Sequence, residues 1–137
     1  GGRVATFSGP LTSTVNVESD QDFFTYETVN YHYMGSYLDT ILAEDIDGDG
    51  RSDLIIGVGD NDDAYLSAGA AFMHYGPLSG TRSHTQFDHA TFGHTTYTRF
   101  GRSLSLGDLN DDGLLDLVGG THLYGIDGSG GTYVFFY

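Results

Sequence analysis

The feature that most constrains this chain is an acidic, glycine-containing segment that occurs twice. Residues 45–57 read DIDGDGRSDLIIG and residues 108–120 read DLNDDGLLDLVGG, so the two copies begin 63 residues apart. A repeat of this kind has to be identified first, because each copy represents one structural unit that packs against the next. The chain is therefore built from at least two similar units.

A second motif occurs three times and keeps the same order relative to the first. It is glycine-led and aromatic, and it reads GRVATFSG at residues 2–9, GAAFMHYG at 69–76 and GGTYVFFY at 130–137. Short apolar or aromatic runs bounded by glycine are typical of β-strands, whereas no window shows sustained helical periodicity. We therefore expect an all-β fold.

Each unit is expected to contain four short strands. They are one strand before the acidic loop, one directly after it (53–57 and 116–119), the glycine-led strand, and a weaker fourth strand (within 86–92 and within 14–29). Four antiparallel strands in a unit of about sixty residues favour a β-propeller blade over a two-sheet sandwich. The runs 41–43 and 54–56 are nearly all apolar, so we expect both strands to be covered on both faces.

The first acidic loop has the composition of a calcium site. Calcium accepts six to eight oxygen ligands in flexible geometry, whereas magnesium needs a stricter octahedron. Gly50 at the sixth position permits the sharp turn that such a loop requires. We expect a ligand set made of alternating acidic side chains and one backbone carbonyl, namely Asp45, Asp47, Asp49, Asp53 and the carbonyl of Arg51.

The second acidic loop repeats this pattern with one change. Its expected ligands are Asp108, Asn110, Asp112, Asp116 and the carbonyl of Leu114. An amide replaces one carboxylate, so we expect a weaker second Ca²⁺ site, with Asp111 facing solvent. An EF-hand would need a bidentate glutamate at position 12 and flanking helices, but that position is Ile56 or Gly119 and the flanks read as strands.

Composition excludes several functions. The chain has 19 acidic and five basic residues, a net charge of −14, which disfavours nucleic acid as a partner. No apolar run has membrane-spanning length, so we expect no membrane insertion. Cysteine is absent, and no serine-hydrolase, zinc-protease, P-loop or dinucleotide motif is present, which favours a binding module over an enzyme.

The acidic loop, placed between two strands, resembles the calcium loop of FG-GAP repeats, as in integrin α-subunit propellers. Phe100-Gly101, Ser103-Leu104 and Gly107-Asp108 are similar to the first half of that repeat, and 130–137 is similar to its aromatic strand. The first copy departs from it, with Tyr37-Leu38-Asp39 in place of Phe-Gly, and neither copy keeps Gly-Ala-Pro after the second strand.

The resemblance implies a structural calcium ion in each loop and ligand contacts on the opposite face of the propeller. That face includes the loops between second and third strands, 60–66 and 121–129. The candidate ligand-binding residues there are Asp60, Asp62, Asp63, Tyr65, His122 and Tyr124. The three aspartates also suit a further weak cation site, although a solvated acidic loop is the favoured interpretation.

The blades divide the chain, taken as a single partial-propeller unit over 1–137, into three parts. Residues 1–35 hold the third and fourth strands of a preceding blade, 36–98 a complete blade with calcium loop 45–53, and 99–137 an incomplete blade with calcium loop 108–116. A closed propeller has four to eight blades. We therefore expect either a piece of a larger propeller or a protomer that closes a ring with copies of itself.

Two further features of the sequence have structural explanations. His84, His89 and His94 lie five residues apart and alternate faces on a strand, so exposed histidines are favoured over a zinc site. Packing between blades is favoured over sugar stacking for six aromatic residues: Phe23, Phe24, Tyr26, Tyr31, Tyr33 and Tyr37.

The leading function is extracellular or cell-surface adhesion or ligand binding, where millimolar calcium fills modest sites, with a protein or glycan as partner. The alternatives are a lectin-like propeller and the non-catalytic propeller portion of a secreted enzyme.

Overall fold

A computed structural model of the chain contains ten β-strands and no helix in the part that it describes. The described residues are 2–7, 9–10, 13–14, 16, 19, 21–26, 34, 40–124 and 128–137, without the side chains of 122–124. Accordingly, within these ranges no helix is long and apolar enough to cross a membrane. The predicted all-β fold is confirmed.

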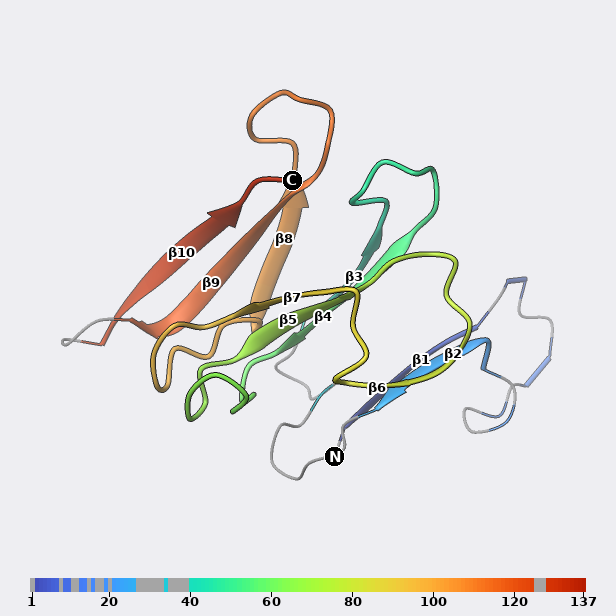
Figure 1. Ribbon diagram of the computed structural model, residues 1–137, viewed down its shortest axis with the longest axis horizontal. Helices are drawn as coiled ribbons and strands as arrows, with labels where there is room; N and C mark the ends of the chain where they lie inside the picture. The colour runs from blue at the N-terminus through green and yellow to red at the C-terminus, as the bar shows by residue number, and fades with distance from the viewer. Residues whose placement is uncertain are drawn as a thin grey trace.

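The strands form three separate sheets, with the four-stranded sheet in the middle (Figure 1). The central sheet is antiparallel throughout, in the order β3 (Ile41–Glu44), β4 (Asp53–Val58), β5 (Ala70–His74) and β7 (His89–Phe92). A second antiparallel sheet contains β8 (Ser103–Gly107), β9 (Asp116–Tyr124) and β10 (Ser129–Phe135). The third contains β1 (Arg3–Thr6), β2 (Phe23–Tyr26) and β6 (Gly80–Ser83).

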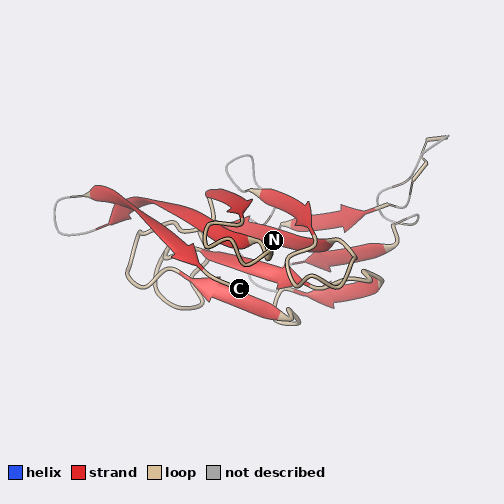
Figure 2. Ribbon diagram, turned by 90° about the horizontal axis from the view of Figure 1, so that it is seen from above, coloured by secondary structure: helices blue, strands red, loops and turns tan. Residues whose placement is uncertain are grey.

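These sheets are open, and together they have the form of partial propeller blades. In the central sheet, strand order follows chain order, and the acidic loop connects the first two strands, β3 and β4. The second acidic loop occupies the same place between β8 and β9. Seen from above, the strands lie in layers, with the loops gathered mainly around their ends (Figure 2). The expected four-stranded antiparallel blade is present in the central sheet.

The coverage predicted for the first strand of the central sheet is wrong. β4 is buried along its whole length, as expected, but Ile41 of β3 is 48% exposed, and Ala43 and Glu44 are also exposed. Among the described residues, β3 is an edge strand that pairs only with β4. An apolar run reports strand propensity and cannot distinguish an edge strand from a central one.

Strand β6 was not predicted from the sequence. Along the chain, β6 comes between the third and fourth strands of the central sheet. In space it pairs in parallel with β2 of the N-terminal sheet, from Phe23 opposite Gly80 to Tyr26 opposite Ser83. The sequence Gly-Thr-Arg-Ser has no apolar alternation, so only the free edge of β2 specifies this strand. The middle repeat thereby contributes backbone hydrogen bonds to its neighbour.

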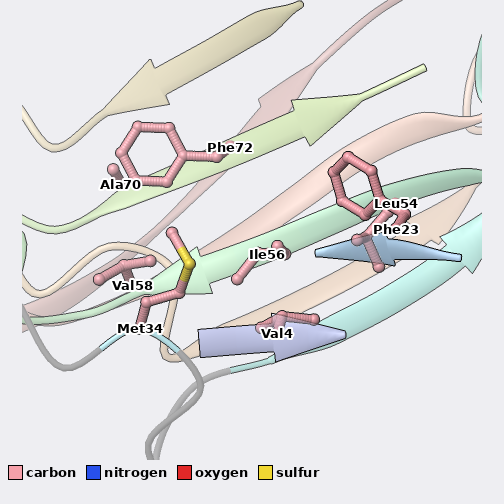
Figure 3. Close-up of a cluster of buried hydrophobic side chains, with 8 residues drawn as sticks. All are labelled: Val4, Phe23, Met34, Leu54, Ile56, Val58, Ala70 and Phe72. Carbon is pink, nitrogen blue, oxygen red and sulfur yellow. The ribbon is translucent and has the colours of Figure 1, made fainter. Parts of the chain in front are cut away.

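The first hydrophobic core lies between the N-terminal sheet and one face of the central sheet (Figure 3). Leu54, Ile56 and Val58 of β4 point towards Val4 and Phe23, because alternate residues of a strand face the same side. The prediction that aromatic residues pack between blades is confirmed for Phe23, which is fully buried. Tyr31, Tyr33 and Tyr37 lie outside the described residues.

The second core fills the space between the other face of the central sheet and the C-terminal sheet. It consists of Ile46, Ile55, Ala71, Met73, Phe100, Leu104 and Leu117. Backbones approach closely here: a Cβ atom on Gly57 would lie 1.8 Å from the carbonyl oxygen of Gly101. The Phe100 ring occupies the space that a Cβ on Gly119 would need, at 2.0 Å. Phe100-Gly101 therefore forms the packing contact between two blades.

One of the three evenly spaced histidines differs from expectation. His89 and His94 are exposed as predicted, but His84 is only 1% exposed. Its ring meets Phe72 edge-on at 6.2 Å, and its Nε2 atom lies 3.8 Å from Asp63 Oδ2. His84 leaves β6 and turns into the first core, a position that five-residue spacing does not reveal.

Candidate metal centre

The first acidic loop joins β3 to β4 and brings three carboxylates together. One oxygen from each of Asp45, Asp47 and Asp49 lies within 4.8 Å of the others. Asp45 is half-buried, and the other two side chains are exposed. Three like charges at this separation repel one another, so the arrangement favours a cation. Across the described ranges, no other group of three or more His, Cys, Asp or Glu side chains converges in this way.

The loop is shaped by hydrogen bonds from its own backbone to these side chains. The Asp45 carboxylate accepts bonds from the backbone N–H groups of Gly48, Asp49 and Gly50, at 2.9, 3.0 and 2.8 Å. Asp47 Oδ1 accepts a further bond from the Asp49 N–H at 3.1 Å. Gly48 and Gly50 have φ of 77° and 86°, the left-handed region that glycine adopts without strain. The backbone therefore wraps around Asp45.

The second acidic loop repeats these contacts. The Asp108 carboxylate accepts bonds from the N–H groups of Asp112 and Gly113, at 3.1 and 2.9 Å, and Asn110 Oδ1 accepts one from the Asp112 N–H at 3.0 Å. Two differences separate it from the first loop. Asp111 occupies the position of Gly48 with a φ of 61°, and Asn110 Nδ2 donates to Asp112 Oδ2 at 2.9 Å.

The ninth loop position has a structural role that the sequence reasoning missed. Asp53 Oδ2 accepts a bond from the Ile46 N–H at 2.9 Å, and its Oδ1 accepts one from the Gly76 N–H at 2.8 Å. Asp116 makes the equivalent bonds to the N–H groups of Leu109 and Tyr137, at 2.8 and 3.3 Å. Both aspartates are buried, and both link the acidic loop to the end of the third strand. The one available signal was their identical place in both copies.

The remaining expected ligands stay predictions. Asp53 and Asp116 keep lone pairs that a cation can use, in addition to their backbone bonds. The Arg51 guanidinium bonds Asp49 Oδ2 at 3.2 Å, but this ion pair is exposed and weak enough for a divalent cation to displace. The donor set is all oxygen, which fits a hard cation such as calcium.

The candidate ligand-binding residues lie at the other end of the strands. Asp60, directly after β4, pairs with Arg102 at 2.8 Å and with Arg99 at 3.5 Å. Asp62 accepts a bond from the Ser67 N–H. The Asn61 side chain accepts a bond from the Asp63 backbone N–H at its Oδ1 atom and donates one from Nδ2 to Asp63 Oδ2, both at 3.0 Å. Tyr65 is 52% exposed and so is accessible to a partner. His122 and Tyr124 lie on β9, with side chains outside the described part.

Comparison with known proteins agrees with this geometry. Residues 100–135 match the model of the FG-GAP repeat. The chain is 35% identical to Integrin alpha-PS2 of Drosophila melanogaster over 111 residues, which cover 74% of this chain and 8% of that protein. The matched repeat contains β8, the second acidic loop and the aromatic strand β10. The chain therefore belongs to the FG-GAP repeat family, as an integrin-α-like β-propeller chain.

Proposed function

We propose that this chain is a calcium-stabilised propeller module that binds a macromolecular ligand outside the cell. The observation that carries the proposal is the pair of acidic loops, which make equivalent hydrogen bonds at equivalent places in two neighbouring sheets. The family assignment supports an adhesion or ligand-binding role over an enzymatic one. Extracellular calcium at millimolar levels would fill sites of modest affinity.

The calcium ions are structural in this proposal. Three carboxylates face one another beside β4, and calcium removes their repulsion while holding the β3–β4 connection. The first loop would use Asp45, Asp47, Asp49, Asp53 and the Arg51 carbonyl. The second would use Asp108, Asn110, Asp112, Asp116 and the Leu114 carbonyl. It binds more weakly, because Asn110 supplies no charge and already donates to Asp112.

Further blades complete the propeller in this proposal. The division into 1–35, 36–98 and 99–137 belongs to this proposal, and the grouping of the strands into three sheets, apart from β6, supports it. β10 corresponds to β5, but within the described residues it lacks the outer neighbour that β7 provides for β5. Val134 and Phe136 are exposed beside this open edge of the sheet. We therefore expect another blade, from a longer chain or from a copy of this one, to cover the edge.

A cell-adhesion assay tests the binding role. Cells are added to immobilised chain in 1 mM calcium, with EDTA and an Asp45→Ala/Asp47→Ala variant as comparisons. We expect adhesion in calcium that is lost in both comparisons and retained in Asp111→Asn, which changes one loop charge outside the ligand set. Absence of adhesion in calcium would contradict the proposal, and binding confined to a glycan array would favour the lectin alternative.

A further inference from the structure

Although the protein is strongly acidic, it contains one cluster of side chains in which positive charge exceeds negative charge. Arg102 Nη2 lies 2.8 Å from Asp60 Oδ2, and Arg99 Nε lies 3.5 Å from Asp60 Oδ1. Two guanidinium groups therefore share a single carboxylate. Among the other ion pairs of the described residues, Arg51 and Arg82 each meet one aspartate. The Asp60 cluster thus carries a net positive charge in a protein with a net charge of −14.

A pocket opens beside this cluster. It has a volume of about 320 Å³ and is lined by Arg102, Ser103, Gly120 and Thr121, at the start of β8 and the facing part of β9. Ser103 is exposed, whereas the Thr121 hydroxyl donates to the Gly131 carbonyl at 3.2 Å. The pocket therefore offers one guanidinium and one free-standing hydroxyl at its surface.

Arg102 is held in place from three sides. The Thr40 hydroxyl donates to its carbonyl oxygen at 3.0 Å. Its aliphatic stem crosses Gly59, where a Cβ atom would lie 2.2 Å from Arg102 Cγ. Asp60 bonds one end of the guanidinium, yet the Nε atom is buried without a hydrogen-bond partner in the described structure. The side chain is thus positioned before any ligand arrives. Because Nε is buried and Nη2 bonds Asp60, a ligand would have to use the guanidinium donors that neither of these accounts for.

We propose that this pocket binds one carboxylate group of the partner that the module recognises. The inference rests on the proposed binding function and specifies the chemistry of the ligand. A guanidinium forms paired, charge-assisted bonds with the two oxygens of a carboxylate, and the Ser103 hydroxyl adds a further donor. Elsewhere the acidic surface repels anions, so the pocket also selects where an acidic group docks.

Two sources can supply this carboxylate, an aspartyl side chain in a protein and an acidic sugar. The probes are sodium acetate, the peptide acetyl-Gly-Asp-Gly-amide and N-acetylneuraminic acid, each added to the isotope-labelled 137-residue chain at constant free calcium and ionic strength. Backbone amide shifts of Ser103 and Gly120 are the readout, with sodium chloride as the anion control. We expect saturable shifts with acetate, with a dissociation constant on the order of millimolar. The probe that binds more tightly identifies the source.

Matched variants locate the binding. Arg102→Gln removes the cation while Arg99 still pairs with Asp60, and it should weaken acetate binding about tenfold or more. Gly120→Val keeps both arginines and fills the pocket, since a Cβ there lies at an ordinary 3.5 Å from Ser103 Cβ. It should abolish the shifts. Arg82→Gln removes the same charge from a different aspartate pair and should leave them unchanged. The calcium-induced rise in melting temperature confirms that each variant folds.

Two results would overturn the inference: no saturable shift with any probe, or shifts that persist in both Arg102→Gln and Gly120→Val. Calcium-dependent cell adhesion of the same variants separates this failure from failure of the proposed function. If adhesion continues although the pocket binds no carboxylate, the carboxylate-site inference is contradicted and the proposed binding function is not.

Discussion

The packing of Gly101 against the central sheet leads to a prediction about the blade interface. Gly101 has a φ of 100°, and a Cβ atom there would lie 2.2 Å from the Ala70 carbonyl oxygen and 2.8 Å from the Val58 nitrogen. Ordinary contact needs at least 3.4 Å. Gly101→Ala therefore requires two backbones of neighbouring blades to separate by roughly 1 Å, in addition to strain at a positive φ.

Gly80 is the matched control, because its φ is 75° and a Cβ there meets nothing within 4 Å. Gly80→Ala should lower the free energy of unfolding by about 1 kcal/mol, from backbone strain alone. Gly101→Ala should lower it by about 3–4 kcal/mol, because overpacking adds about 2–3 kcal/mol to the same strain.

Urea unfolding of both variants in calcium, followed by fluorescence, measures these values. The difference between the two variants isolates the steric contact between the blades. Equal losses for Gly101→Ala and Gly80→Ala would refute the close backbone packing on which the blade assignment depends.

Three further predictions concern single side chains. Burial, with Arg82 nearby, lowers the pKa of His74 to about 4, so below pH 6.5 the unfolded chain takes up the proton first and the fold loses stability as pH falls. His74→Leu should therefore remove about 2 kcal/mol of the stability loss between pH 7.5 and pH 5, measured by urea unfolding at each pH, and an unchanged loss would contradict this. Asp111→Gly should raise stability by about 0.5–1 kcal/mol in thermal melts, because glycine accepts the φ of 61° without strain, and a decrease would contradict the loop geometry. Asp53→Ala should lower the free energy of unfolding by about 3 kcal/mol even in EDTA, because it leaves the buried N–H groups of Ile46 and Gly76 unpaired. A loss of stability seen only in calcium would mean that Asp53 acts as a calcium ligand and has no structural role of its own.

Much of this fold could be predicted because the repeat supplies two aligned copies of the same signals. The second and third strands of each unit are apolar or aromatic runs bounded by glycine, and such runs identify β4, β5 and β10 directly. The acidic loops were recognisable because carboxylates at alternate positions, with glycine between them, have few other uses. Local chemistry therefore specified the elements and the candidate metal centre.

Features that depend on the neighbouring blade could not be predicted in this way. β6 forms only because β2 offers a free edge, and β3 is exposed only because it lies at the edge of its sheet. His84 is buried because the chain turns inwards after β6. The pairing of Asp60 with Arg99 and Arg102 joins residues about 40 positions apart, and no local pattern announces it. Each of these depends on tertiary contacts that residue spacing does not encode.

Calcium binding to the intact chain tests the central claim most directly. Isothermal titration of chelator-treated chain with calcium should show two sites, the tighter lost in Asp45→Ala/Asp47→Ala and the weaker lost in Asp108→Ala/Asp112→Ala. Calcium should also raise the melting temperature, because an ion that binds only the folded state stabilises it. Absence of binding heat, together with a melting temperature that EDTA leaves unchanged, would contradict a calcium-stabilised propeller.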